Sequence, residues 1–393
     1  MYKPFKPFKK GLRIIEKNTS SLMSDFLQFE KEKDKSYTPL PVIKRGKGPY
    51  IYDYDDNRFV DFFMSAGSLL LGHAHPGITK IIKSWLGRGY ASGYAAASHE
   101  LLSKRLFQLL LDKHQKNYRD YKWFYYNSSF EAVLSLFSLL EICGHTGHGI
   151  YLSGSDEDGK FTPFHIDLVE RISPLSIDEK HISTLDFVII RFGKTMNYGK
   201  IESILKRLHE KGVIIVSDET EFNTYIYIFH NKDLQKFINV RVFGNWVSSG
   251  ISFGCIFADN RVFTSIQKHK NSGIFQKLLP VMGFPPYYKI KAAIEFSGIM
   301  ERYGGIEGLI QKNKDFFLAL GNKYFNIINN NIYIKENEFL FSNFRKLHSL
   351  LLENSIYFPF SPNTPIFTSL SHSNELLQKS AGRINLLFNV FYR

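Results

Sequence analysis

The 393-residue sequence has few cysteines and no long apolar run. Its two cysteines, Cys143 and Cys255, form no CxxC pair and no metal-ligand spacing, which excludes a disulfide framework and predicts a reducing, cytoplasmic environment. The longest uncharged stretches, residues 62–79 and 242–258, contain His, Ser, Gly or Asn, so we expect no membrane span. No Walker phosphate loop and no GxGxxG sequence occurs, which leaves two common nucleotide-binding motifs absent.

The positive charge of the chain is concentrated at one end. There are 50 Lys and Arg against 37 Asp and Glu, a formal net charge of +13, and residues 1–50 hold 12 basic and 5 acidic residues. A nucleic-acid groove needs basic residues clustered on folded elements, so we expect a basic N-terminal arm and no nucleic-acid partner. Its repeat KPFKPF at residues 3–8 cannot be helical, because proline fixes φ and lacks an N–H. A flexible or docked tail and a contact with an anionic surface both stay open.

The hydrophobic pattern alternates between strand-length and helix-length segments. The runs 187–190 and 213–216 are continuously apolar, which is typical of strands buried on both faces of a parallel sheet. Two alternating runs around an Asp-Asp-Asn turn predict a hairpin over residues 49–61. We therefore expect an α/β protein with a mostly parallel sheet. The predicted strands are Gly149–Leu152, Asp186–Arg191, Gly212–Ser217 and Ile251–Phe257, and the predicted helices are residues 12–33, Ser98–Leu111, Ser129–Cys143 and Lys200–Lys211.

Two segments have the chemistry of a ligand site. In open α/β sheets ligands collect at the carboxyl ends of the strands, and Asp218 and Glu219 end a predicted strand. Their carboxylates can partner a cationic ligand atom, or Asp218 is an ordinary helix N-cap. Ser128 and Ser129 precede a predicted helix, whose start is either an anion site or a plain serine cap.

The histidine pair in His73-Ala74-His75-Pro76 does not predict a metal site. The two histidines are only two residues apart in a predicted loop, and no carboxylate pattern accompanies them. We expect no bound metal.

Residues 41–76 carry the strongest family signal. They contain the hairpin, Ser-Ala-Gly at 65–67 and Leu-Gly-His-Ala-His-Pro at 71–76, in one order and spacing. This block resembles class III pyridoxal-phosphate-dependent aminotransferases, and glutamate-1-semialdehyde aminomutases in particular. The resemblance continues to about residue 390, through segments 89–100, 127–132, 216–219, 243–250, 356–359 and 369–372.

The resemblance implies fold type I of the pyridoxal-phosphate-dependent transferases, with a large domain and a smaller α+β lobe built from N- and C-terminal segments. It divides the chain into a basic arm and helix (1–40), a hairpin segment packing with the small lobe (41–71), a large cofactor-type domain (72–287) and a small domain (288–393). It also implies a homodimer.

Several family positions are altered. The resemblance implies a lysine that forms a Schiff base, but the matching residue is Asn245, whose amide nitrogen is not nucleophilic. Ser128 and Ser129 would hold the cofactor phosphate, crowded by Phe130. Asp218 is the one clearly kept residue, and it would hydrogen-bond the protonated ring nitrogen.

Three further motifs have also changed. Arg191-Phe192 stands where the family has Glu-Pro, and no ring-covering Tyr-His-Gly is visible in residues 152–156. Met282-Gly283-Phe284-Pro285 matches a family Thr/Ser-Gly-Asn-Pro. Joint loss at several positions predicts a relaxed cofactor site.

The sequence therefore predicts a pseudoenzyme of this family that acts as a binding or partner subunit, with a small-molecule ligand left open. The alternative is an enzyme that uses pyridoxal phosphate or pyridoxamine phosphate for altered chemistry on an amino acid or keto-sugar. In that case Lys194 would be the relocated amine, or the cofactor would bind without a lysine. The candidates for a separate base are His73, His75 and His372.

Overall fold

The computed structural model describes residues 5–10, 13, 40–88, 97–111, 118–145, 147–153, 170–172, 179–194, 196, 198–229, 231–263 and 285–392. The chain divides into two compact units. Unit 1 combines Met1–Pro76 with Glu307–Arg393, and unit 2 is Gly77–Ile306. The sequence places the corresponding boundaries at residues 72 and 288, and that division stays a prediction. The predicted helix over residues 12–33 lies outside the described residues, apart from Arg13.

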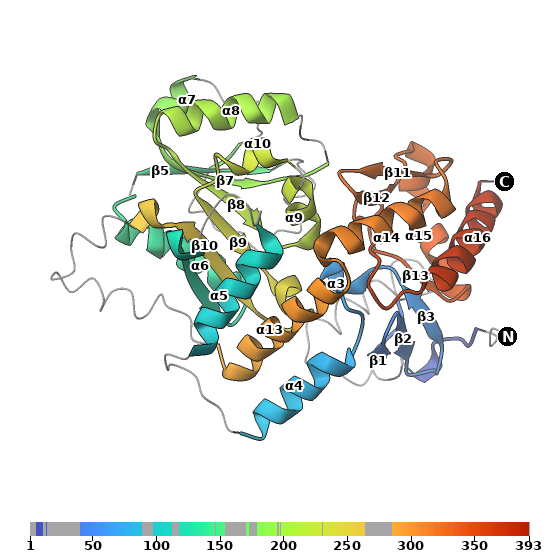
Figure 1. The fold of residues 1–393 in the computed structure, drawn as a ribbon. Helices are drawn as coiled ribbons and strands as arrows, with labels where there is room; N and C mark the ends of the chain where they lie inside the picture. Colours follow the sequence, from blue (N-terminus) through green and yellow to red (C-terminus); the bar gives the residue numbers. More distant parts are fainter. Residues whose placement is uncertain are drawn as a thin grey trace. The chain divides into compact units, whose positions relative to one another are not determined.

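The described part of unit 2 contains a seven-stranded sheet in the order β4-β10-β9-β8-β7-β5-β6. Figure 1 shows β5, β7, β8, β9 and β10 side by side in this order. Only β10 runs antiparallel to both of its neighbours, which confirms the predicted mostly parallel sheet. The strands are β4 (Tyr121–Tyr126), β5 (His148–Ser153), β6 (Glu170–Ile172), β7 (Leu185–Arg191), β8 (Ile214–Glu219), β9 (Val240–Phe243) and β10 (Gly254–Asp259).

Helices cover both faces of this sheet, because successive strand residues point to opposite sides. On one face Tyr151, Ile189 and Val216 pack with residues of α6. On the other face Val188 and Ile215 pack with residues of α8 and α9. The helices of unit 2 are α4 (Pro76–Leu86), α5 (Ala97–Leu110), α6 (Ser129–Ile142), α7 (Glu179–Thr184), α8 (Tyr198–Glu210), α9 (Phe222–Phe229), α10 (Lys232–Gln235) and α13 (Tyr287–Arg302), with short 3₁₀ turns η1 (Tyr118–Asp120), η4 (Asn245–Ser248) and η5 (Asn260–Phe263).

Unit 1 joins the two ends of the chain in one small sheet. Strands β1 (Ile43–Lys47), β2 (Tyr50–Asp53) and β3 (Arg58–Asp61) are antiparallel, and β13 (Ile356–Tyr357) adds to β3 in parallel. The predicted hairpin is therefore confirmed, and so is the lobe built from N- and C-terminal segments. The other elements are α3 (Met64–Gly67), α14 (Gly305–Leu320), β11 (Phe325–Ile328), β12 (Asn331–Ile334), α15 (Glu338–Glu353) and α16 (Asn374–Phe391).

The basic N-terminal arm is docked where it is described. Phe8 is buried among Ile51, Phe59 and residues of the C-terminal segment. The Lys6 N–H donates to Asn57 Oδ1 at 2.8 Å, and the Asn57 amide donates back to the Lys6 carbonyl at 2.9 Å. Residues 5–10 therefore form a docked rather than a flexible tail, and the contact with an anionic surface stays a prediction.

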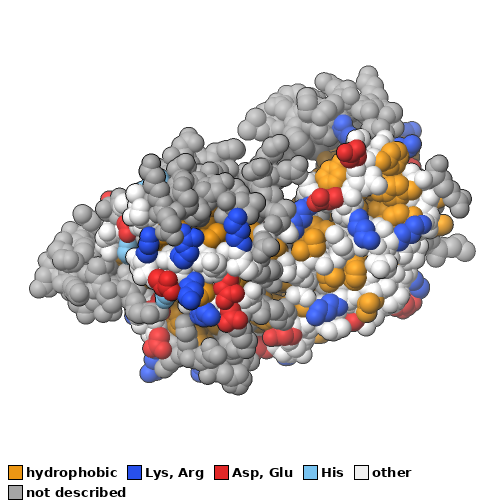
Figure 2. All heavy atoms as spheres, turned by 90° about the horizontal axis from the view of Figure 1, so that it is seen from above, with side chains coloured by type: hydrophobic (Ala, Val, Ile, Leu, Met, Phe, Trp, Pro, Cys, Tyr) orange, Lys and Arg blue, Asp and Glu red, His pale blue; other side chains and the backbone are white. Residues whose placement is uncertain are grey.

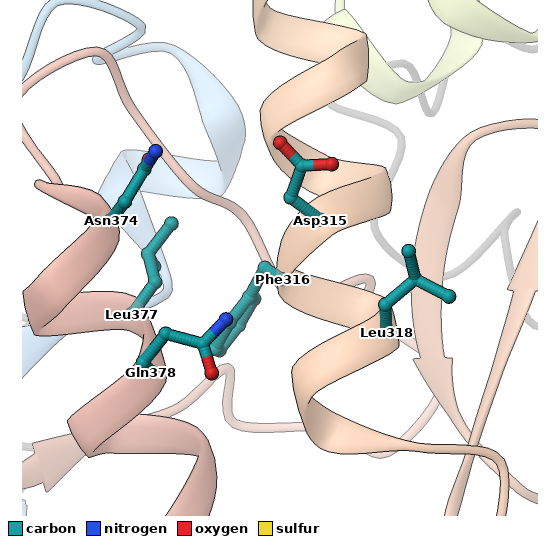
Figure 3. A pocket seen from close by; sticks show the side chains of 6 residues that line it. All are labelled: Asp315, Phe316, Leu318, Asn374, Leu377 and Gln378. Atoms are coloured by element: carbon teal, nitrogen blue, oxygen red, sulfur yellow. The ribbon is translucent and has the colours of Figure 1, made fainter.

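A cavity of about 300 Å³ lies in unit 1 between α14 and α16. Phe316 and Leu377 form part of the unit 1 core between the two helices, while Asp315, Asn374 and Gln378 supply polar groups (Figure 3). None of the residues predicted to form a site from the sequence lines it.

Charges of both signs lie on the surface of the described residues. On the face shown in Figure 2, Lys and Arg side chains are interspersed with Asp, Glu and hydrophobic side chains. Among the described residues no helix has the length and apolarity needed to cross a membrane. The described residues also contain no group of three or more His, Cys, Asp or Glu that could hold a metal ion.

Two buried histidines make the stability of unit 1 dependent on pH. Burial lowers the pKa of His348 and of His372 to about 4. An unfolded histidine titrates near pH 6.5, so the unfolded chain binds more protons between about pH 4 and 6.5. The neutral histidines therefore make their full contribution to the free energy of unfolding above about pH 6.5. This contribution is lost as the pH falls from about 6.5 to about 4.

We expect the free energy of unfolding to drop by about 2 kcal/mol per histidine between pH 7 and pH 5. Urea unfolding at the two pH values measures this difference. The variant H348Q/H372Q supplies the control, because glutamine does not titrate. An equal pH dependence in the wild type and the variant would contradict the assignment.

Candidate functional site

The carboxyl ends of the parallel strands of unit 2 bring the predicted site residues to one edge of the sheet. β4 leads into Ser128 and Ser129, β8 carries Asp218, and β9 leads into Asn245. Arg191 is the last residue of β7. Since parallel strands end on the same edge, this sheet gathers residues that are far apart in the sequence.

Asp218 is buried, and its carboxylate accepts from four protein donors. Oδ1 accepts from the Thr220 N–H at 3.1 Å and from Thr220 Oγ1 at 2.7 Å. Oδ2 accepts from the Tyr151 hydroxyl at 2.9 Å and from Arg191 Nη1 at 3.4 Å. A carboxylate offers about four acceptor positions, so a further N–H donor finds none free. The helix N-cap alternative is not observed, since Asp218 lies within β8.

Arg191 lies between two carboxylates. Its Nη2 atom is 2.6 Å from Glu221 Oε1, while Nη1 faces Asp218. Burial lowers the pKa of Arg191, but Glu221 and Asp218 outweigh burial and hold it above its ordinary value. The guanidinium is therefore a fixed positive charge at this edge.

Tyr151 completes the group as a neutral donor. Burial, reinforced by the negative charge of Asp218, raises the pKa of Tyr151 well above its usual value. The phenol therefore stays protonated, and its O–H donates a hydrogen bond to Asp218 Oδ2. No role could be predicted for Tyr151 from the sequence, because a tyrosine inside an apolar strand resembles an ordinary core residue.

The start of α6 is closed by its own side chains. Ser128 is the N-cap and accepts from the Glu131 N–H at 3.1 Å. The Glu131 carboxylate accepts from the Asn127 N–H at 2.7 Å. These reciprocal bonds satisfy the Glu131 N–H in the first turn and the Asn127 N–H just before the helix. Phe130, expected to crowd this site, is 48% exposed.

Ser129 and Asn245 are linked across the site. The Ser129 hydroxyl donates to Asn245 Oδ1 at 2.9 Å, and the Phe253 N–H approaches the same oxygen at 3.4 Å. The residue before Asn245 is Gly244. Its backbone packs directly on the Thr220 carbonyl, so a Cβ atom at this position would collide with that oxygen. The structure thus brings Asn245 and Ser129 together beside the strand that carries Asp218.

A lysine that the sequence did not single out also reaches this edge. Lys289, in the first turn of α13, donates from Nζ to the Asn127 carbonyl at 3.0 Å. Burial lowers the pKa of Lys289, opposed by the charge of Glu131. No motif of the sequence singles out Lys289, because a lysine in the first turn of a helix is usually exposed to solvent.

Lys194, predicted as a relocated amine, and three histidines, predicted as candidate bases, are the other residues singled out from the sequence. Lys194 lies three residues after the end of β7 and is half-buried. His73 and His372 belong to unit 1, where His73 Nε2 is 2.7 Å from Asp61 Oδ2 and His372 Nδ1 accepts from Ser369. His75 also belongs to unit 1.

A second buried ion pair supports the site from the opposite face of the sheet. Arg241 donates to both oxygens of Glu219, at 2.7 and 2.5 Å, and both side chains are buried. The Trp246 indole donates to the Glu219 carbonyl at 2.9 Å, which ties η4 to the end of β8. Glu219 is therefore a structural residue, whereas Asp218 faces the α6 side.

Residues Gly250–Gly254 have the GxSxG spacing. Its serine, Ser252, precedes a strand rather than a helix, and its hydroxyl donates to the Asn127 carbonyl at 2.8 Å. A nucleophile elbow requires a strand followed by a helix, so this segment is not one.

Comparison with known proteins gives a partial sequence match. Residues 32–139 match the family model of class-III aminotransferases. Glutamate-1-semialdehyde 2,1-aminomutase from Thermus thermophilus is 36% identical over 107 residues, which is 27% of this chain and 23% of that protein. The matched segment thus spans about a quarter of its curated relative.

Solved structures share the fold over a far greater length. Adenosylmethionine-8-amino-7-oxononanoate aminotransferase from Methanocaldococcus jannaschii gives a TM-score of 0.70 at 19% identity, over 93% of this chain and 99% of that one. A transaminase with PLP bound gives 0.66 at 15% identity, over 88% and 92%. Residues 32–139 therefore resemble class-III aminotransferases in sequence, and the chain has the α/β fold of the pyridoxal-phosphate-dependent aminotransferases.

Proposed function

We propose that this chain is an aminotransferase-fold protein that does not carry out lysine-dependent transamination and that acts by binding, as a ligand-binding or partner subunit. One observation carries the proposal: every acceptor position of the Asp218 carboxylate is taken by a donor of the protein itself. The other altered positions agree with it, each for a separate chemical reason.

The pyridine ring of the family's cofactor does not fit at Asp218 as the residues stand. A protonated ring nitrogen needs a free carboxylate lone pair, and Arg191 Nη1 and the Tyr151 hydroxyl already share Oδ2. Displacing Arg191 from Asp218 would leave its almost fully buried charge with Glu221 as its remaining acidic partner.

The cofactor's phosphate does not fit at the start of α6 either. Three of the donors there are bonded within the protein: the Glu131 N–H to Ser128, the Asn127 N–H to Glu131 and the Ser129 hydroxyl to Asn245. The Glu131 carboxylate also places a negative charge at the start of the helix, which offsets the helix dipole.

Asn245 cannot form the covalent bond to the cofactor that a lysine at this position would form. An imine requires a primary amine, and the lone pair of an amide nitrogen is delocalised into its carbonyl. The amide oxygen instead accepts from Ser129 and the Phe253 N–H. In this proposal Asn245 acts as a structural link between η4 and α6.

The protein is proposed to be a cytoplasmic homodimer. Phe130 and Leu134 are one turn apart in α6, and 48% and 40% of their surfaces are exposed. Large apolar side chains exposed together are typical of an interface. A second copy of the chain is the occupant that the resemblance implies.

Lys289 favours one competing function, an enzyme that uses a pyridoxal or pyridoxamine cofactor for altered chemistry. Its amine lies at the Asn127 carbonyl, one residue from the N-cap of α6, and its lowered pKa increases the neutral, nucleophilic fraction. A carbonyl ligand held at this edge would have an amine within reach.

One experiment separates these two functions. The purified protein is mixed with pyridoxal phosphate, its visible spectrum is recorded, and the mixture is reduced with borohydride before peptide mass spectrometry. We expect no specific spectral band and no dominant modified lysine. A stoichiometric adduct on Lys289 that disappears in Lys289→Met, with Lys194→Met as the matched control, would overturn the proposal in favour of the enzyme.

Restoring the amine alone is expected to be insufficient. The variant Asn245→Lys should bind pyridoxal phosphate no more tightly than the wild type and show no transamination, because Asp218 and the start of α6 stay occupied. Equilibrium dialysis and an amino-acid half-transamination assay measure the two quantities. Clear turnover by Asn245→Lys would mean that the rest of the site is intact.

A further inference from the structure

The group around Asp218 is arranged as a receptor for a cation. Thr220 donates twice to one carboxylate oxygen, and Tyr151 donates to the other. These three bonds fix the orientation of the carboxylate without any help from Arg191. A second carboxylate, Glu221, faces the same guanidinium from the other side.

The charge balance of this group is negative without Arg191. Asp218 and Glu221 are both acidic, and Tyr151 is neutral because burial raises its pKa. Arg191 is the positive charge that they share, at 3.4 Å and 2.6 Å. With the guanidinium removed, two carboxylates would face one space with no compensating charge from this group.

The ion pair between Arg241 and Glu219 in the same sheet is structural, and it differs from the Arg191 group. Arg241 binds both oxygens of one carboxylate, and its guanidinium lies 5.2 Å from the centre of the Phe243 ring. The Glu219 side chain is 0% exposed, whereas the Glu221 side chain is 33% exposed. The Arg191 group therefore lies at the strand ends with one carboxylate in reach of solvent, where ligands of α/β sheets bind.

We propose that Arg191 is a built-in occupant of a cation site formed by Asp218, Glu221 and Tyr151, and that it excludes a planar organic cation from that site. The ligand class of the vacated site is a small planar cation with N–H donors, such as a guanidinium or a protonated nitrogen heterocycle. This inference rests on the proposed function, in which no cofactor ring occupies Asp218.

The test is chemical rescue of Arg191→Ala. Thermal unfolding of the variant is followed with millimolar guanidinium chloride, with sodium chloride at equal ionic strength, and with tetramethylammonium chloride, which has no N–H donor. We expect a lowered Tm that guanidinium raises by several degrees and that the other two salts do not raise, because a ligand that binds only the folded state stabilises it. Arg241→Ala is the matched control, and we expect no such rescue because its site is closed.

The effect of guanidinium on the Tm of each variant decides whether the inference holds. An unchanged Tm response to guanidinium in Arg191→Ala relative to the wild type overturns it. If Arg191→Ala does not fold, refolding is compared with and without guanidinium, and no recovery of folded protein overturns it as well. In the triple variant Arg191→Ala/Asp218→Asn/Glu221→Gln, the guanidinium effect must vanish, since the two carboxylates are gone.

Failure of this inference is distinct from failure of the proposed function. The proposed function fails if the wild type forms a specific pyridoxal-phosphate adduct, whatever Arg191→Ala does. The inference fails if rescue is absent, even when the wild type forms no adduct.

Discussion

A charge taken out of water must be compensated by the protein, and the carboxyl edge of the unit 2 sheet is organised by that requirement. Asp218 and Arg191 are both buried, and each compensates the other. Glu221 supplies the excess negative charge that keeps the guanidinium in place, and Tyr151 supplies an uncharged donor. The interaction turns a position suited to ligand binding into an internal contact.

The sheet topology makes this contact available. Tyr151, Arg191 and Asp218 come from β5, β7 and β8, which are parallel neighbours, so their side chains reach one face near one edge. The same topology places Ser129 and Asn245 beside them, after β4 and β9. A fold that elsewhere presents these strand ends to a ligand here uses them to bind its own side chains.

Much of the fold could be predicted from the sequence, because buried parallel strands and a hairpin turn leave local patterns. The runs 187–190 and 213–216 are found in β7 and β8, and the Asp-Asp-Asn turn joins β2 to β3. The strands β4 and β9 were not predicted, since KWFYY and VRVF carry polar residues that break the apolar run. Tertiary burial of Arg241 against Glu219 explains why VRVF is nevertheless a strand.

Only part of the site could be predicted from the sequence. Asp218, Ser128 and Ser129 were predicted from a strand end and a helix start, and Asn245 from the resemblance; all four lie at one edge of the sheet. Arg191 was seen as a departure from the family but without a role, because its partners Asp218 and Glu221 are more than 25 residues away. Charge pairing between neighbouring strand ends depends on strand order, which a single sequence does not specify.

We propose that Arg191, and not a bound ring, neutralises Asp218. A crystal structure of the protein grown in excess pyridoxal phosphate tests this proposal. We expect Arg191 Nη1 within bonding reach of Asp218 Oδ2, with Tyr151 on the same oxygen and no ring at the carboxylate. A pyridine nitrogen bonded to Asp218, with the Arg191 side chain displaced, would contradict it.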